Sequence, residues 1–541
     1  MDSGFVGHVH ALRLALTDPR FDACAVTGAI AVQPGARAAL DKAAESAPEG
    51  AGPYADRLAA VVETAGTTVQ RPELGTLVAA VPATTAERDA AAAAVVAVDD
   101  EAVRLRTAVK SRDGFFTTFF ISPYSRYIAR WCARRGLTPN QVTTASLITA
   151  LIAAGCAATG ERWGYVAAGV LLLVSFVLDC TDGQLARYSL QYSTMGAWLD
   201  ATFDRAKEYS FYAGLALGAA RNGDDVWALA LGSMILMTCR HVVDFAFNEA
   251  NHDATANTSP TAALSDKLDS VGWTVWVRRM IILPIGERWA MIAVLTAVTT
   301  PRIVFCALLI GCAFGALYTT AGRVLRSLTR KATRTDRAAQ ALADLADSGV
   351  LAWVRSSAPA KRRPDKAAVW LALAGSVLMV GGAVTRDFRD PWLIGTAVAY
   401  AFFSGAAVSR PLKGPLDWLI PPLFRFAEYV TILALAAKSD VPGALPAAFG
   451  LVAAVAYHHY DTVYRIRGGS GAPPRWLVRA IGGHEGRVLL TVVLATVLAR
   501  DAFPVALTAM AVFVALVVLV ESIRFWVSSG APAVHDEGEP A

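Results

Sequence analysis

The chain has 541 residues, of which 55% are hydrophobic and 18% charged, and its formal net charge is +5. It is too long for one compact domain and too apolar for an ordinary soluble protein, and so small a charge gives no reason to expect a nucleic-acid partner. The seven cysteines are an odd number without the Cys-x2-Cys spacing of a zinc site, so we expect buried hydrophobic side chains rather than disulfides. These properties predict an all-α polytopic membrane protein.

Residues 1–105 differ from the rest of the chain. They alternate short apolar runs with alanine-rich stretches and Gly/Pro breaks. This pattern predicts a small α/β region in the cytosol.

Residues 110–140 combine basic and aromatic side chains at helical spacing. Arg126, Arg130 and Arg134 are interleaved with aromatic residues such as Tyr127 and Trp131. Such a helix lies well on an anionic membrane surface. A nucleic-acid patch is the alternative, but an apolar span follows at once, which favours the membrane surface.

Twelve apolar stretches follow in two blocks of six, most of them close to the roughly 20 residues needed to cross hydrocarbon. They lie near 141–158, 164–187, 196–220, 226–248, 288–300 and 302–322, and near 368–385, 392–409, 418–437, 442–460, 486–499 and 503–525. The expected regions are 1–105, 106–326 with the first block, a basic cytosolic linker 327–366, the second block 367–527 and a disordered tail 528–541. Basic residues flank alternate ends of the spans, so we expect a cell-membrane protein with both termini in the cytoplasm.

The two blocks share a sequence pattern. Trp198-Leu199 followed by Arg205, Glu208 and Tyr209 recurs as Trp418-Leu419 followed by Arg425, Glu428 and Tyr429. Glu287-Arg288 has a looser counterpart in Glu485-Gly-Arg487. The matches predict an internal duplication. Ile420 and Phe424 stand where the first block has Asp200 and Asp204, so we expect the second copy to lack an acidic site.

Four carboxylates stand out within the first block. Asp179 and Asp182 share one helix face, and Asp200 and Asp204 share a face of the next helix. Carboxylates in a membrane are costly and mark functional sites. A converging cluster of four needs cations, and oxygen ligands favour Mg²⁺ or Mn²⁺. The site is expected to open toward the cytoplasm, because Arg187 ends the same span.

The spacing Asp-x2-Asp-Gly-x2-Ala-Arg-x8-Gly-x3-Asp-x3-Asp, from Asp179 to Asp204, resembles the CDP-alcohol phosphotransferase signature at all eight of its defined positions. An EF-hand needs carboxylates at every second position, which this stretch lacks. The lead-in around Lys110, Asp113 and Gly114 is most similar to the inositol-phosphate branch of the family.

Physical roles can be given to the signature residues. The four aspartates would hold one or two divalent ions that neutralise a pyrophosphate. Gly183 and Ala186 leave room for a base or ribose, and Arg187 is a cation for phosphate oxygens. Gly196 is expected to let the third span approach the second.

The resemblance implies further roles. Asp204 would also be the general base. Asn140, Thr143 and Ser193 would contact the nucleotide. Basic residues near the ends of later spans would hold an acceptor phosphate; Arg240, His241, Arg279 and Arg288 are the candidates.

The resemblance also implies the activity: transfer of a phosphatidyl group from CDP-diacylglycerol to a polyol or inositol-phosphate hydroxyl, with release of CMP, in phospholipid biosynthesis. Alternatives are a CDP-polyol donor such as CDP-inositol, or a non-enzymatic twelve-span transporter. Some relatives carry an N-terminal cytidylyltransferase. Residues 1–105 lack its Gly-rich nucleotide loop, so we expect a degenerate remnant. The second block can act as a structural partner within the chain, or two chains can form a homodimer.

Overall fold

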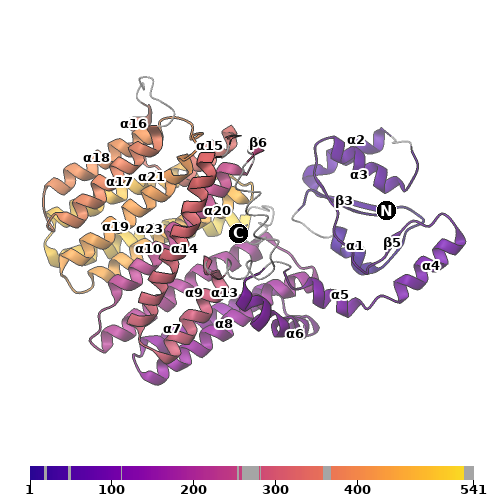
Figure 1. Ribbon diagram of the computed structural model, residues 1–541, viewed down its shortest axis with the longest axis horizontal. Helices are drawn as coiled ribbons and strands as arrows, with labels where there is room; N and C mark the ends of the chain where they lie inside the picture. The colour runs from indigo at the N-terminus through magenta and orange to yellow at the C-terminus, as the bar shows by residue number, and fades with distance from the viewer. Residues whose placement is uncertain are drawn as a thin grey trace.

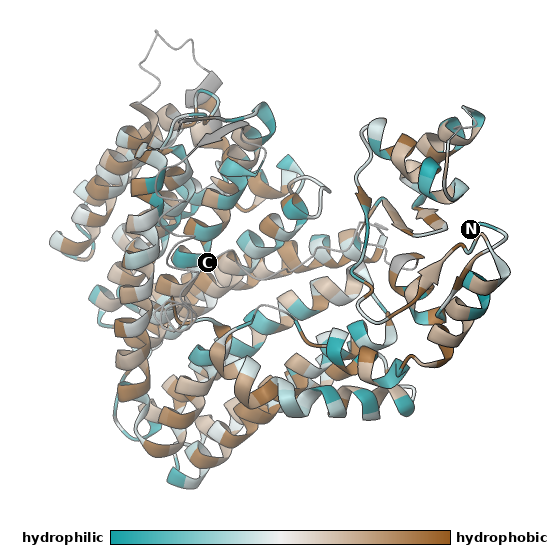
Figure 2. Cartoon of the chain, turned by 45° about the vertical axis from the view of Figure 1, so that its right-hand side comes forward, coloured by the Kyte–Doolittle hydropathy of each residue, from teal (hydrophilic) through white to brown (hydrophobic). Residues whose placement is uncertain are grey.

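The computed structural model describes residues 1–16, 21–46, 50–110, 113–252, 255–258, 280, 282–329, 331–357 and 367–528. Helices make up most of this part of the chain, and the longer ones pack side by side in two blocks (Figure 1). Hydrophobic residues run along these helices (Figure 2). The protein is therefore an all-α polytopic membrane protein with a small α/β region at its N-terminus.

The N-terminal region has its own small core. Strands β2 and β3 form an antiparallel hairpin that turns at Gly28, where φ is +77°, and β4 pairs with β2 in parallel. Ala25, Leu58 and Val62 are buried between this sheet and helices α2 and α3. The elements are β1 (Val6–Gly7), α1 (Val9–Leu16), β2 (Ala23–Val26), β3 (Ala29–Val32), α2 (Arg37–Glu45), α3 (Tyr54–Thr64), β4 (Val69–Gln70), β5 (Ala79–Ala80), α4 (Thr85–Val96) and α5 (Asp100–Thr107).

Helices occupy all twelve predicted span positions. The first block holds α7 (Pro139–Ala158), α8 (Arg162–Ser189), α9 (Thr194–Arg221), α10 (Trp227–Asn251), α13 (Ile285–Val298) and α14 (Pro301–Thr329). The second holds α17 (Ala367–Thr385), α18 (Trp392–Ala407), α19 (Ile420–Ser439), α20 (Ala444–Arg467), α22 (Gly483–Val497) and α23 (Phe503–Ser528). In the described residues, eight helices are long and apolar enough to cross a membrane. Of the other four, α13 and α18 are short, with 14 and 16 residues, and α9 and α20 carry several charges.

The helix predicted to lie on the membrane surface, with its interleaved basic and aromatic residues, precedes the first block. Helix α6 (Ser122–Arg134) follows a single π-helical turn, Thr117–Ile121. Its Tyr124, Tyr127 and Trp131 are exposed, and Arg126 and Arg130 each lie over the Tyr127 ring.

Helix α7 is the centre of the first block, because it packs against both α8 and α9. The hydroxyls of Ser146 and Ser175 donate to each other's carbonyl oxygens between α7 and α8, at 2.8 and 2.9 Å. On α9, a Cβ at Gly214 or Gly218 would lie 2.4 or 2.1 Å from a carbonyl oxygen of α7. Small residues thus bring two helix backbones together, as is usual in membranes.

Gly196 corrects one expectation. A Cβ there would lie 2.8 Å from Asn140 Oδ1 of α7 and 2.8 Å from Ser193 Oγ. The glycine therefore lets the third span approach the first span, α7, rather than the second.

The second block repeats the first in its buried ion pairs. Arg205 donates to Glu208 at 2.8 Å, and Arg288 lies 3.4 Å from the same carboxylate. The equivalent residues make the equivalent contacts: Arg425 to Glu428 at 2.7 Å and Arg487 Nη2 to Glu428 at 3.2 Å. The recurring residues therefore serve the same structural purpose in both blocks.

The similarity extends upstream of each block. Glu287, at the start of α13, accepts a hydrogen bond from the backbone N–H of Phe116 at 3.2 Å. Glu485, at the start of α22, accepts from the N–H groups of Gly349 and Ala352, each at 3.0 Å. Residues 327–366, expected as a linker, contain α15 (Asp336–Leu345) and α16 (Val350–Ser357), and α15 buries Leu342 in the common core. The second repeat thus begins before its first long helix. Other short elements are β6 (Thr255–Thr258), β7 (Lys331–Thr333) and α21 (Arg475–Ala480).

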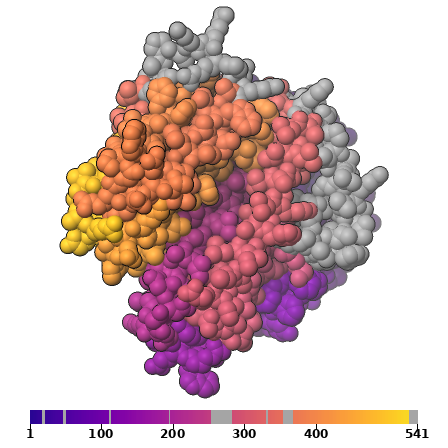
Figure 3. Space-filling view, turned by 60° about the vertical axis from the view of Figure 1, so that its left-hand side comes forward, coloured from indigo at the N-terminus to yellow at the C-terminus, as the bar shows by residue number. Residues whose placement is uncertain are grey.

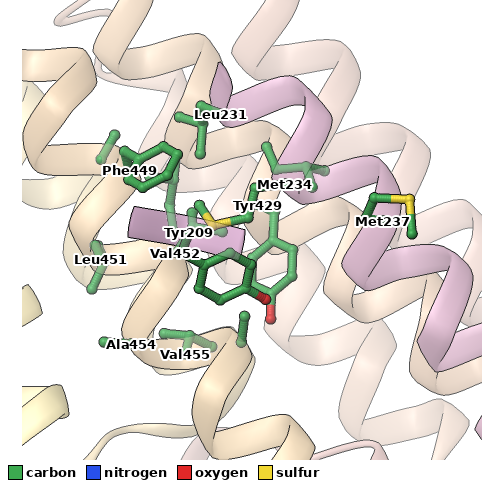
Figure 4. Packing of buried hydrophobic residues seen from close by; sticks show 14 of the residues in the cluster. Tyr209, Leu231, Met234, Met237, Tyr429, Phe449, Leu451, Val452, Ala454 and Val455 are labelled. Atoms are coloured by element: carbon green, nitrogen blue, oxygen red, sulfur yellow. The ribbon is translucent and has the colours of Figure 1, made fainter. Parts of the chain in front are cut away.

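The two blocks form one interface (Figure 3). Helix α10 packs against α19 and α20, and α9 packs against α20. Helices α19 and α20 are the counterparts of α9 and α10. The contact of α10 with α19 is therefore equivalent to the contact of α9 with α20, as in a two-fold symmetric dimer. Tyr209 and its counterpart Tyr429 both belong to the buried hydrophobic cluster that the two blocks share (Figure 4).

Candidate active site

The acidic cluster lies where α8 and α9 face each other near their adjoining ends. Asp179 and Asp182 are on the last three turns of α8, and Asp200 and Asp204 are on the first three turns of α9. Ser193 caps α9 by accepting from the N–H of Gly196 at 2.9 Å. Thr138 and Gln141 form a capping box at the start of α7, which orients Asn140 beside α9.

Three of the four carboxylates converge. One oxygen each from Asp179, Asp200 and Asp204 lie within 4.8 Å of one another, a spacing that could hold a metal ion. Asp182 lies outside this group; it is buried, and its Oδ2 has no hydrogen-bond partner among the described residues. An all-oxygen donor set and an unsatisfied buried carboxylate oxygen both fit a hard divalent cation.

Lys207 is an unpredicted member of the cluster. Its Nζ contacts Asp179 Oδ1 and lies 3.1 Å from Asp204 Oδ1, and its side chain is 0% exposed. Lys207 is three residues after Asp204 on the same helix face, so its position was a signal available in the sequence.

The cluster lines a cavity of about 1010 Å³. All residues predicted to bind the metal ion or the CDP-alcohol donor line this same cavity. They are Asn140, Thr143, Asp179, Asp182, Gly183, Ala186, Arg187, Ser193, Gly196, Asp200 and Asp204. A Cβ at Gly183 would meet only the Arg187 guanidinium, at 3.5 Å, so this glycine leaves space on the cavity side of α8. Arg187 donates through Nε to the carbonyl of Ala108 at 2.6 Å, which ties it to the end of α5.

Three of the predicted acceptor residues, Arg240, His241 and Arg288, do not line the cavity. Arg288 pairs with Glu208, and His241 bonds through Nδ1 to the hydroxyl of Tyr460 in the second block. Arg240 is buried and does not line the cavity. Arg279 lies outside the described residues. Among the described residues, the cations that line the cavity are Lys110 and Arg187.

Other regions of the chain also contribute to the cavity wall. The N-terminal region supplies Gln70, Pro72 and Glu73, and α20 of the second block supplies Tyr464. No local motif marks these residues, because only the packing of the three regions brings them to the site.

In the second block, aromatic side chains fill the place that corresponds to the acidic cluster of the first block. Phe424, at the position of Asp204, is fully buried and stacks on His484 with ring centroids 4.2 Å apart. Tyr400 donates to or accepts from His484 Nδ1 at 2.7 Å. Over the described ranges, the cluster of the first block is the single group of three or more His, Cys, Asp or Glu side chains that could hold a metal ion.

Comparison with known proteins identifies the first block. Residues 136–316 match the model of the CDP-alcohol phosphatidyltransferase family. Residues 336–541 match a family of unknown function, DUF5941. The first block is therefore similar to the CDP-alcohol phosphatidyltransferases.

The relatives carry inositol-phosphate names. The chain is 33% identical to an archaetidylinositol phosphate synthase of Pyrococcus horikoshii over 21% of the chain and 58% of the relative. It is 28% identical to a bifunctional IPC transferase and DIPP synthase of Aquifex aeolicus over 37% of the chain and 45% of the relative. It is 35% identical to a phosphatidylinositol phosphate synthase of Mycolicibacterium smegmatis over 22% of the chain and 53% of the relative. The matches cover about half the length of these relatives, and they support the inositol-phosphate branch.

Proposed function

We propose that residues 106–326 transfer a phosphatidyl group from CDP-diacylglycerol to a hydroxyl of an inositol phosphate or related polyol phosphate, releasing CMP. The observation that carries this proposal is that every predicted metal and donor residue lines one cavity. The names of the relatives support a phosphorylated inositol as acceptor.

The reaction needs a base, a cation for phosphate and a means of charge neutralisation. The acceptor oxygen would attack the phosphorus that carries the lipid, its proton would pass to Asp204, and the bond from that phosphorus to the CMP oxygen would break. Arg187 would bind phosphate oxygens. Asp179, Asp182, Asp200 and Asp204 would hold Mg²⁺ or Mn²⁺, which when bound supplies charge stabilisation to the pyrophosphate.

We further propose that the cavity opens to the cytoplasm at the cell membrane. The basic residues of α6 and Arg187 lie at the same end of the bundle as the cluster, and the positive-inside rule favours the cytoplasm for that end. Tyr124, Tyr127 and Trp131 of α6 would lie in the lipid headgroups.

The decisive test is a CMP-release assay with the full chain in nanodiscs. CDP-diacylglycerol and CDP-inositol serve as alternative donors, and inositol phosphate, glycerol phosphate and serine serve as acceptors. We expect Mg²⁺- or Mn²⁺-dependent CMP release with CDP-diacylglycerol and inositol phosphate. Absence of CMP with every pair would refute the proposal, and accumulation of intact substrate in proteoliposomes would support a transporter instead.

We infer that residues 1–105 have no nucleotidyltransferase activity and serve as a cavity wall. Incubation of the full chain with CTP and inositol phosphate is expected to release no pyrophosphate. Pyrophosphate release that persists in an Asp204→Asn variant would contradict this inference.

A further inference from the structure

Lys207 is a buried cation inside the acidic cluster. Its ammonium group contacts one oxygen of Asp179 and one of Asp204, which belong to different helices. No water reaches its side chain, which is 0% exposed. A buried ammonium needs such partners, because desolvation without them is costly.

The lysine takes up ligand capacity that a metal ion would otherwise use. Each carboxylate offers two oxygens, and Lys207 holds Oδ1 of both Asp179 and Asp204. A second divalent ion between these two aspartates would have to displace Nζ. The displaced ammonium would then lie buried without the carboxylates that compensate its charge.

A single ion is compatible with the lysine. One oxygen each from Asp179, Asp200 and Asp204 form a three-carboxylate group, and each of these residues has a second oxygen for another contact. Lys207 supplies one positive charge to the four carboxylates, and one divalent ion supplies two more, which leaves one uncompensated negative charge. The remaining charge suits the approach of a cationic side chain or a substrate-bound ion better than a second resident ion.

We propose that Lys207 occupies one cation position of the cluster, so that the resting protein binds one divalent ion per chain rather than two. This inference rests on the proposed function, because it takes the cluster to be the metal site of the transferase. It assigns a positioning role to a residue outside the family signature.

The test counts Mn²⁺ ions bound to the purified full chain without substrate. Free Mn²⁺ is measured by electron paramagnetic resonance at increasing total Mn²⁺. We expect one ion per wild-type chain, and two per chain for Lys207→Met with the dipolar broadening of a close Mn²⁺ pair. Lys438→Met is the matched control: this lysine binds the carbonyl oxygens of Val384 and Arg386 in the second block, far along the chain from the cluster. It should bind one ion.

The outcomes separate the two levels of inference. Two ions on the wild-type chain would overturn the role of Lys207 while leaving the transferase proposal intact. One ion on both wild type and a folded Lys207→Met variant, with folding checked by size exclusion, would also overturn it. If Lys207→Met does not fold, Lys207→Gln replaces it and the wild-type count still decides. No ion on the wild-type chain would overturn both this inference and the metal site of the proposed function.

Discussion

At the scale of single residues, Asp204 combines two proposed roles, metal ligand and general base. Asp204→Asn preserves the shape of the side chain but removes its charge. We expect CMP release at saturating Mn²⁺ to fall about 10²- to 10⁴-fold, the usual range for loss of a general base. Single-turnover CMP release measures this loss. Asp440→Asn is the control, because Asp440 lies outside the site and has a left-handed backbone conformation that asparagine tolerates; this variant should keep the wild-type rate. An unchanged rate for Asp204→Asn would exclude Asp204 as the general base.

The two signature glycines can be distinguished by adding one methyl group to each. Gly196→Ala places a Cβ 2.8 Å from Asn140 Oδ1, so we expect a loss of stability of about 1–3 kcal/mol together with a loss of activity. Gly183→Ala meets only the Arg187 guanidinium, so we expect normal stability and a raised KM for the donor. Thermal unfolding in detergent and steady-state kinetics measure both effects. Gly322→Ala, which has nothing within 4 Å, is the control, and an equal stability loss in all three variants would contradict the distinction.

At the scale of helices, the sequence predicts the architecture well because span length and apolar content decide where a helix can cross a membrane. Helices occur at all twelve expected positions, and the metal and donor residues meet because one short signature fixes them on adjacent helix ends. The acceptor candidates show the limit of this reasoning. An arginine near a span end serves equally well in a buried ion pair, and Arg288 pairs with Glu208. Only three-dimensional packing distinguishes the two roles.

The contact between helices α5 and α6 depends on one exposed carboxylate. Arg130 and Arg134 of α6 both donate to Glu101 of α5, at 3.0 Å each. The hydrogen bond from Arg130 is the main cause that lowers the pKa of Glu101 below its ordinary value, while slight burial opposes it. A lowered folded-state pKa means that the contact stabilises the protein above the unfolded-state pKa and is lost as the pH falls through the folded-state pKa.

We therefore expect the connection between α5 and α6 to become more accessible to protease below about pH 4, near the ordinary pKa of a glutamate. Glu101→Gln should show this accessibility already at pH 7, with little further change on acidification, because the amide cannot ionise. Limited proteolysis with an acid-tolerant protease across the pH range measures the difference. Equal pH dependence in both proteins would assign the effect to another group. High salt should weaken the contact in the wild-type protein, since the pair is exposed.

At the scale of the whole molecule, the two blocks share a pattern of buried ion pairs but differ at the acidic cluster. Both contain the Arg–Glu–Arg ion pairs, which hold the third and fifth of the six helices of each block together. The first block keeps the carboxylates, while Phe424 and His484 fill the equivalent place in the second. The second block presents α19 and α20 to the first, in the manner of a symmetric partner. We therefore expect the second block, which lacks an acidic cluster among its described residues, to support the site of the first.

Tyr460 of α20 provides a direct test of that support. The Arg205 guanidinium lies over its ring, 4.9 Å from the centroid, and Arg205 is the neighbour of Asp204. Loss of such a cation–π contact costs about 0.5–2 kcal/mol. If the contact positions Asp204, Tyr460→Ala should lower kcat by roughly 2- to 30-fold on that basis, with an unchanged number of bound Mn²⁺ ions.

Tyr460→Phe keeps the ring but removes the hydroxyl that bonds His241, so it should retain most of the wild-type kcat. Tyr318→Ala, at an exposed position on α14, controls for the loss of a membrane aromatic residue. A low kcat in Tyr460→Phe equal to that in Tyr460→Ala would assign the effect to the hydroxyl rather than to the ring over Arg205. A wild-type kcat in a folded Tyr460→Ala variant would mean that the second block does not act on the site through Tyr460. Tyr464, which lines the cavity, would then be the residue of α20 to test next.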